Sequence, residues 1–387
     1  MSTDNSDNEY ASIEDELSVD HEQLEAFTAD LGRAVGASDD IAEIVAESLT
    51  LADLRGHNSH GTRSYPTYAS RVDGGGEDVY SLSPDARPEV TVDKKMFAQV
   101  DGNDGFGQYI GRYATDLAIE KASEHGVGVV GVRDATHIGR IGEWSEQATA
   151  EGFAFSAYVN LQSPGRVTIP GSSARRLSTN PVSFGVPTFD ALDFPVVLDM
   201  ATSQCAGGKI SECKDKGIPL PDGWAIGHDG KPYKDPAGVK GDREDAAQLL
   251  LGGTVAGHKG FGLSMINELF ASIMSGGEIV GQSDYYKGNC GLFVAIDPLM
   301  ASTQEEIEER VTALAEYIRE TESNPNVSMG PAAMGDRALV PGEPEHITEQ
   351  RRREEGIPMP EKAGQALAEL AADLGVEDSV PDAIRNA

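Results

Sequence analysis

The part of the sequence that decides how the chain is organised is residues 53–63, which read Asp53-Leu54-Arg55-Gly56-His57-Asn58-Ser59-His60-Gly61-Thr62-Arg63. A helical pattern runs into this stretch and stops at Gly56, because glycine adopts the left-handed conformation that ends many helices. Three functional groups follow: the Ser59 hydroxyl, the His60 imidazole and the Arg63 guanidinium. An imidazole exchanges protons near neutral pH, and a guanidinium binds a carboxylate in two places. A polar turn with a structural histidine is the alternative, but the clustering at a helix end favours an active site.

The same stretch resembles the N-terminal signature of the malate/L-lactate dehydrogenase type 2 family. That family includes ureidoglycolate and sulfolactate dehydrogenases and reductases of 2-keto acids and cyclic imines. The match continues in order through Asp101-Gly102-Asn103-Asp104-Gly105-Phe106-Gly107-Gln108, His137-Ile138-Gly139-Arg140-Ile141-Gly142-Glu143, Thr179-Asn180-Pro181, Asp199-Met200-Ala201-Thr202-Ser203, His258-Lys259-Gly260 and Pro341-Gly342-Glu343. So ordered a series, spread over most of the chain, is hard to obtain by chance.

The resemblance implies an α/β protein that binds NAD or NADP without the usual Rossmann fold, and it implies a homodimer. It also implies a helical domain built from both chain ends, with the cofactor- and substrate-binding α/β domain inserted between them. A chain of 387 residues is long enough for such a division. We therefore expect an acidic disordered tail at residues 1–18, helical parts at 19–87 and 301–387, and the α/β domain at 88–300.

The composition is strongly acidic, with 64 Asp and Glu against 31 Lys and Arg and a formal net charge of -33. Such a surface repels nucleic acid and anionic membranes, so neither is an expected partner. Because 39% of the residues are hydrophobic, the chain can still bury a core, and the charge suits a salty, halophilic cytoplasm. Three cysteines without a CxxC pair favour a reducing compartment. No signal-type segment or membrane-length apolar run occurs, so we expect a cytoplasmic protein.

Hydrophobic periodicity predicts helices near both ends and strands alternating with helices between them. Capping patterns mark helix starts at Asp20 and Thr303, and Pro66 suits the first turn of a short helix ending at residues 74–76. Further helices are expected from Ser38 to the stop at Gly56 and at residues 105–122, 263–274, 345–355 and 361–374. Strands are expected at residues 97–100, 126–132, 153–159, 182–186, 196–198 and 291–296.

Two glycine-rich segments are candidate anion-binding turns. Residues 105–111 follow a predicted strand and open a helix, but their GxGxxxG spacing is not the GxGxxG dinucleotide fingerprint. The favoured interpretation is a close approach of chain segments beside the cleft. In residues 137–142, alternating glycines leave backbone amides accessible, and Arg140 can meet a phosphate or carboxylate. A plain turn capped by His137 is the alternative there.

Four shorter motifs complete the candidates. Asp199 ends an apolar strand, where a carboxylate can orient a histidine or simply cap the next turn. His258 and Lys259 lie between glycines at the start of a helix, where amides and an ammonium group suit a pyrophosphate. Residues 179–181 and 341–343 look like ordinary turns when taken alone.

The resemblance assigns roles to these residues. In the reducing direction His60 would protonate the developing alkoxide at C2 of a small 2-oxo acid, with Ser59 and Asp199 as its relay. Arg63 would hold the substrate carboxylate, and His137 is the alternative acid/base. The cofactor contacts that carry over are His137, Ile138, Gly139, Arg140, Thr179, Asn180, Asp199, Met200, Ala201, His258, Lys259, Gly342 and Glu343.

Other chemistries are less well supported. His57, His60 and His137 lack the HxxxH and HExxH spacings of zinc sites, so no metal is expected, and Ser59 lacks the GxSxG elbow of a hydrolase. Residues 170–173 and 204–209 depart from the family pattern. The substrate therefore stays open among malate, lactate, sulfolactate, ureidoglycolate and a cyclic imine, as does the choice of NAD or NADP. A redox-inactive relative that binds a small acid is a further alternative.

Overall fold

The computed structural model describes residues 16–72, 74, 80–240, 243–322, 324, 333–334 and 337–386. At its centre is a seven-stranded sheet with the strand order β2-β3-β4-β10-β5-β6-β7. Within this sheet β3 and β4 pair in parallel and the other neighbours pair antiparallel. The prediction of an α/β protein is confirmed, with a mixed sheet. The strands span Glu89–Asp93 (β2), Phe97–Asp101 (β3), Val127–Ala135 (β4), Ala154–Leu161 (β5), Val182–Val186 (β6), Val196–Met200 (β7) and Asn289–Ile296 (β10).

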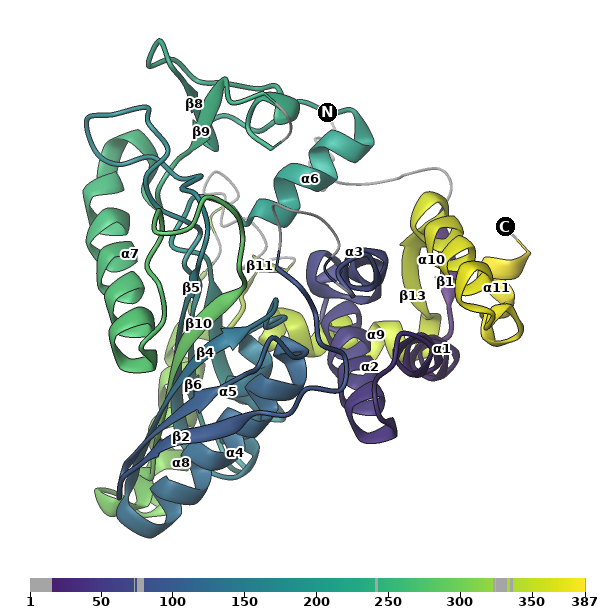
Figure 1. Ribbon diagram of the computed structural model, residues 1–387. Coiled ribbons are helices and arrows are strands. Elements are labelled where there is room, and N and C mark those ends of the chain that lie inside the picture. The colour runs from purple at the N-terminus through teal and green to yellow at the C-terminus, as the bar shows by residue number, and fades with distance from the viewer. Residues whose placement is uncertain are drawn as a thin grey trace.

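Helices cover the two faces of the sheet differently (Figure 1). Helices α4 (Gly107–His125) and α5 (Gly142–Ala150) pack on one face, and the long helix α7 (Gly253–Ser275) lies along the other. The main core of the sheet lies on the α4/α5 side, where Trp144 is fully buried. A Cβ atom at Gly111 would lie 2.6 Å from the Trp144 ring, so a larger residue at that position would push α4 away from α5.

The glycines of residues 105–111 bring chain segments together. A Cβ atom on Gly107 would lie 2.4 Å from the carbonyl oxygen of His137. The Gly107 amide donates a hydrogen bond to Thr136 Oγ1 at 3.1 Å. Only glycine permits so close a backbone approach. The interpretation of this segment as packing glycines is therefore confirmed, and its effect is to fix residue 137 beside the start of α4.

Helices from both ends of the chain share a second hydrophobic cluster beside the sheet (Figure 1). Its buried side chains include Phe27, Leu31 and Leu49 from the N-terminal side and Leu367 and Ile384 from the C-terminal side. Strand β1 (Glu16–Val19) pairs antiparallel with β13 (Ile357–Pro360), which ties the two ends together. The helices of this region are α1 (His21–Ala34), α2 (Asp39–Leu54), α3 (Tyr65–Ala69), α9 (Glu343–Glu355), α10 (Glu361–Leu374) and α11 (Asp382–Arg385).

Three predicted boundaries need correction. A disordered tail was expected at residues 1–18. Residues 1–15 lie outside the described residues, and residues 16–18 belong to β1. The helix that starts near Pro66 ends at Ala69 instead of residues 74–76. Helix α8 (Gln304–Arg319), which we grouped with the C-terminal helices, packs near β7 instead, where its Ala315 contacts a cluster with Phe194 and Val340. An amphipathic pattern identifies a buried face but does not name the partner that covers it.

A small substructure lies beyond one end of the sheet (Figure 1). It contains α6 (Gly207–Lys216) and the strand pair β8 (Ala225–Gly227) and β9 (Ala246–Gln248), held by a cluster that includes Ile210 and Leu220. Sequence periodicity did not predict these elements. Among the helices of the described residues, none combines the length and apolar character needed to span a bilayer.

Candidate active site

The turn after α2 is organised by a buried carboxylate. Asp53 is 3% exposed and accepts hydrogen bonds from the Thr62 amide at 2.9 Å and from Thr62 Oγ1 at 2.7 Å. Gly61 leaves room for this carboxylate, since a Cβ there would lie 2.0 Å from Asp53 Oδ1. Burial raises the pKa of Asp53 to about 6, against the lowering effect of these bonds. The closed turn presents Ser59 and His60 to the space beside the sheet.

That space is a cavity of about 720 Å³ between the helical region, the sheet and the start of α6. A volume of this size is typical of a site for a small organic ligand. Of the residues expected at the site, the cavity brings together Ser59, His60, His137, Ile138, Gly139, Arg140, Thr179, Asp199, Met200 and Ala201.

Two imidazoles lie against each other in this cavity. The rings of His60 and His137 stack with their centroids 5.4 Å apart and their planes 28° apart. Ser59 Oγ lies 2.9 Å from His60 Nδ1. The Tyr68 hydroxyl lies 2.6 Å from His137 Nδ1 and accepts a hydrogen bond from Gln108 Nε2 at 3.0 Å. Because Gln108 occupies the acceptor side of this hydroxyl, its proton is directed at His137 Nδ1, and neutral His137 then carries its hydrogen on Nε2.

Both imidazoles are neutral near pH 7. Burial lowers the pKa of His60 well below its ordinary value, and electrostatic interactions with His137, His57 and Arg140 lower it further. Burial also lowers the pKa of His137 to about 4, with Lys240 and Arg71 adding to the effect. Since nearby positive charge contributes to both shifts, an anion bound beside the rings would raise both pKa values.

Asp199 interacts with a different histidine from the expected one. Its Oδ2 accepts a hydrogen bond from the Gly142 amide at 2.8 Å. Burial raises its pKa, and electrostatic interactions with His57 and Arg140 act against that rise. His57 Nε2 also lies 3.3 Å from Glu345 Oε1 on α9. Asp199 and His60 line the same cavity, but within the described residues no hydrogen bond joins them, so a direct Asp199–His60 relay is absent from this geometry.

Cations that no sequence motif marked also line the cavity. They are Arg71, which follows α3, Arg166, which follows β5, and Lys240, which precedes β9. Glycines at the start of α6 complete this side, and a Cβ at Gly208 would lie 2.5 Å from Ser59 Cβ. Asn289 on β10 holds the loop after β4, because its Oδ1 accepts the Ile138 amide at 3.1 Å. Apart from Arg71, which lies eight positions after Arg63, each lies far in sequence from residues 53–63, and isolated cations or amides carry no spacing signal.

Comparison with known proteins assigns this arrangement to a family. The model of the malate/L-lactate dehydrogenase family matches residues 19–368. The chain belongs to that family.

Similar proteins support the same assignment. The chain is 31% identical to a malate dehydrogenase of Pyrococcus horikoshii over 373 residues, which cover 94% of this chain and 97% of that protein. It is 35% identical to an L-lactate dehydrogenase of Cupriavidus necator over 309 residues, covering 79% and 83%. The crystal structure of malate dehydrogenase from Entamoeba histolytica superposes with a TM-score of 0.85 at 28% identity, covering 93% of this chain and 99% of that one.

Some residues expected from the family lie outside the cavity. Arg63, expected to anchor the substrate carboxylate, is half-buried and is not among the cavity-lining residues; its charge acts on Asp53, His60 and Lys240. Asn180 is fully buried and donates to Glu268 Oε2 at 2.8 Å, with a left-handed φ of 35°. It shapes the chain next to Thr179 and does not border the cavity itself.

The expected contacts near the C-terminus have a structural role. Gly342 has a φ of 94° and precedes α9, and a Cβ there would lie 2.6 Å from the Pro195 carbonyl oxygen. Glu343 is 4% exposed and forms salt bridges with Arg319 at 3.0 Å and Arg337 at 2.7 Å. Its carboxylate is therefore already neutralised. Neither residue lines the cavity of His60, and their expected contact with the cofactor stays a prediction.

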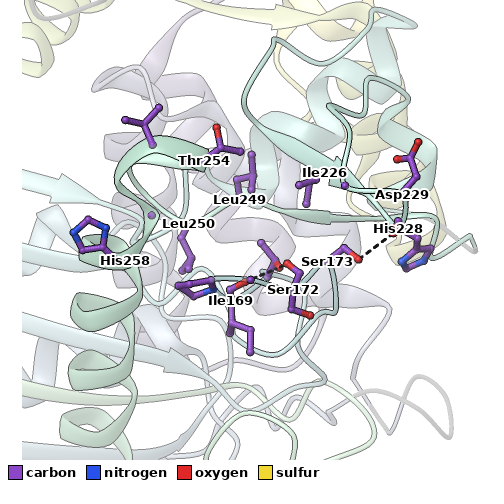
Figure 2. A pocket seen from close by; sticks show the side chains of 17 residues that line it. Ile169, Ser172, Ser173, Ile226, His228, Asp229, Leu249, Leu250, Thr254 and His258 are labelled. Atoms are coloured by element: carbon purple, nitrogen blue, oxygen red, sulfur yellow. Dashed lines mark hydrogen bonds between the residues drawn. The ribbon is translucent and has the colours of Figure 1, made fainter.

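His258 lies in a second cavity of about 550 Å³, and Lys259 is exposed and lines neither cavity. Figure 2 shows this second cavity, with Thr254 and His258 on the first turns of α7 and Ser172 and Ser173 on the loop opposite. Gln204, which lines the first cavity, accepts a hydrogen bond at 3.1 Å from the amide of Gly252. The next residue, Gly253, lines the second cavity. Among the described residues no group of His, Cys, Asp and Glu is arranged to hold a metal ion.

Proposed function

We propose that this chain is an oxidoreductase that transfers a hydride between a nicotinamide cofactor and C2 of a small 2-hydroxy or 2-oxo acid. The observation that carries the proposal is the pair of neutral imidazoles, His60 and His137, in a cavity lined with cations. Such a reaction needs a proton exchanged at the C2 oxygen and a cation for the C1 carboxylate. Relatives named malate dehydrogenase and L-lactate dehydrogenase support the same reaction.

His60 is the proposed acid/base. When the hydroxy acid is oxidised, neutral His60 accepts the hydroxyl proton at Nε2 while its Nδ1–H donates to Ser59 Oγ at 2.9 Å. When the oxo acid is reduced, the same nitrogen returns the proton to the C2 oxygen. Neutral His137 has its hydrogen on Nε2, because Nδ1 accepts from Tyr68. It is therefore suited to donating a hydrogen bond to the C2 oxygen, and less suited to taking the proton.

The C1 carboxylate is assigned to Arg71 in place of Arg63. Arg71 lines the cavity, and its charge reaches His137, whose pKa it lowers. Its guanidinium lies over the Tyr80 ring, 4.3 Å from the centroid, and its Nε and Nη1 have no hydrogen-bond partner among the described residues. Buried guanidinium nitrogens are almost always paired, so unpaired ones beside a cavity favour an anionic ligand.

NAD or NADP is the proposed cofactor, and it supplies or accepts the hydride at nicotinamide C4. Residues 137–140, Thr179 and residues 199–201 fit such a group, since they line the cavity from the loop after β4 and from the sheet. The first amides of α6 have no side-chain cap and suit a phosphate. The second cavity would admit the rest of the cofactor and bring it to His258. The mixed sheet supports binding outside the Rossmann pattern, whose sheet is mostly parallel.

Turnover assays test this function. Purified protein at high salt is mixed with NADH or NADPH and a panel of 2-oxo acids, with and without a chelator. We expect oxidation of at least one cofactor in both cases. The proposal fails if no acid is reduced and neither cofactor binds, as for a redox-inactive relative. It also fails if chelation abolishes turnover and zinc restores it.

We also propose a homodimer that covers the outer side of α7. Apolar side chains are exposed along this helix and on the neighbouring strands, and the Tyr158 ring joins the two groups, with centroids 5.5 Å from Phe270 and 5.9 Å from Phe184. Exposed patches of this kind are rare on monomers and mark protein interfaces. The members on α7 and on β6 and β7 are Met265, Ile266, Leu269, Phe270, Ile273, Phe184, Val186 and Leu198.

Light scattering tests the dimer. Phe270→Glu introduces a charge at the centre of this face and should shift the mass from dimer to monomer. Met96→Glu is the control, because Met96 is 50% exposed and precedes β3, outside this face. A wild-type mass equal to one chain would contradict the proposal.

The three cysteines are free and buried, which supports a reducing cytoplasm as the location.

A further inference from the structure

The sign of the charge in the active-site cavity is opposite to that of the whole protein. Acidic residues outnumber basic ones by 64 to 31 in the sequence. Among the residues that line the cavity, one carboxylate, Asp199, faces a group of cations: Arg71, Arg140, Arg166, Lys209 and Lys240. Like charges gathered in a partly enclosed space repel each other and oppose folding unless an anion joins them.

Two of these cations are not needed for a single carboxylate. Arg140 is paired with Glu146, and Arg71 is assigned to C1. Lys209, Arg166 and Lys240 remain, and none of the three forms a salt bridge with another residue in the described part of the chain. The charge of Lys209 acts on the Cys205 thiol, which leaves Arg166 and Lys240 as the two cations without an assigned partner. Lys240 Nζ donates to the Gly207 carbonyl at 3.2 Å, beside the start of α6.

The two remaining cations lie close to each other and to the imidazoles. The pKa of Lys240 is lowered to about 8 by burial and by the charges of Arg166 and Arg63. The pKa of Arg166 is lowered by burial and by the charges of Arg175 and Arg71. Lys240 in turn lowers the pKa of His137. The Lys240 ammonium and the Arg166 guanidinium therefore line the same cavity as His137, and Lys240 interacts electrostatically with both of the other groups.

We infer that Arg166 and Lys240 bind a second acidic group of the substrate, so that the enzyme acts on dianionic 2-hydroxy and 2-oxo acids. This inference rests on the proposed function. A carboxylate or a sulfonate one or two carbons from C2 has the required charge, and both accept hydrogen bonds from a guanidinium and an ammonium. A monoanion such as lactate leaves the two cations without a partner. Specificity then arises because a bound monoanion does not neutralise Arg166 and Lys240, so the unfavourable repulsion between their charges remains.

The cofactor phosphates are the competing occupant of these cations. The position of Lys240 beside His137 favours the substrate, because that ring lies at the reacting centre. The uncapped amides of α6 are an alternative place for a phosphate. The two occupants differ in what a substitution changes: the discrimination between acids in one case, and the cofactor affinity in the other.

The test compares Arg166→Gln and Lys240→Gln with the wild type. Oxaloacetate and sulfopyruvate are the dianions, and pyruvate is the monoanion. Losing one hydrogen bond to a charged group weakens binding by roughly 10- to 100-fold. We expect the ratio of kcat/KM for each dianion to that for pyruvate to fall by this factor in both variants, while the Kd of the reduced cofactor, measured by fluorescence, stays within about twofold. Lys234→Gln is the control, since Lys234 forms an exposed pair with Asp222.

The outcomes separate this inference from the proposed function. The preferred dianion identifies the second group as a carboxylate or a sulfonate. Equal kcat/KM for pyruvate and both dianions in the wild type would overturn the inference and leave the function standing, as would variants that weaken cofactor binding without changing the ratio. If nothing is reduced, the function fails. In that case, thermal unfolding with malate or lactate added still tests the anion site. A larger rise of the unfolding midpoint with malate than with lactate, lost in Arg166→Gln, would support the site, and equal rises would refute it.

Discussion

The pH dependence of the two reaction directions should reveal the protonation state of the free enzyme. The pKa of His60 lies well below 6.5, so the imidazole is neutral between pH 6.5 and 7.5. Oxidation of the hydroxy acid needs this neutral form, and its kcat/KM should be flat over that range. Reduction needs the protonated form, whose fraction falls about tenfold per pH unit above the pKa. We therefore expect kcat/KM for the 2-oxo acid to fall about tenfold between pH 6.5 and 7.5.

The assay follows NADH or NADPH absorbance under kcat/KM conditions in both directions, at constant ionic strength. The upper limit of pH 7.5 avoids the titration of Lys240, whose pKa is about 8. The ratio of the two kcat/KM values must change tenfold per pH unit in any case, because reduction consumes one proton. The pKa of His60 decides whether kcat/KM for reduction falls with pH or kcat/KM for oxidation rises with pH. A flat reduction profile with oxidation rising about tenfold per unit would refute the reasoning, since it requires a histidine that stays protonated above pH 7.5.

Three further predictions follow from the same geometry. Arg71→Lys should raise KM for the oxo acid at least about tenfold, since an ammonium cannot reproduce a bidentate guanidinium contact, whereas Arg63→Lys should change KM less than about threefold; equal effects on steady-state KM would return the anchor to Arg63. His60→Ala should lower kcat by about 10²–10⁴-fold and leave cofactor affinity nearly unchanged, with His137→Ala made in parallel; near-full turnover of His60→Ala with an inactive His137→Ala would reverse the two roles. Removing salt should lower the midpoint of thermal unfolding, because -33 formal charges repel over a longer Debye length; a midpoint that is flat or falls with added salt would count against this.

Local patterns in the sequence were sufficient to predict most elements and the main members of the site. Gly56 ends α2 with a left-handed φ of 87°, and the capping box at Thr303 starts α8. Helix ends and strand runs depend on interactions between residues a few positions apart, which the sequence displays directly. Ser59, His60 and residues 137–140 could be recognised because their spacing is shared with a family, and the cavity contains all of them.

The tertiary structure alone decided which charged groups face the cavity. Arg63 lies in the same turn as His60 but outside the cavity. Arg71 reaches the cavity from just beyond the short helix α3, and Arg166 and Lys240 reach it from two distant segments. Asp199 was predicted at a strand end, yet its nearby imidazole is that of His57. Glu343 matched a motif but is buried against two arginines. The physical reason is the same in each case. The burial, the ion pairing and the pKa of a side chain depend on how segments far apart in the sequence pack together. The spacing of residues along the chain does not show which side of a segment stays exposed to the cavity.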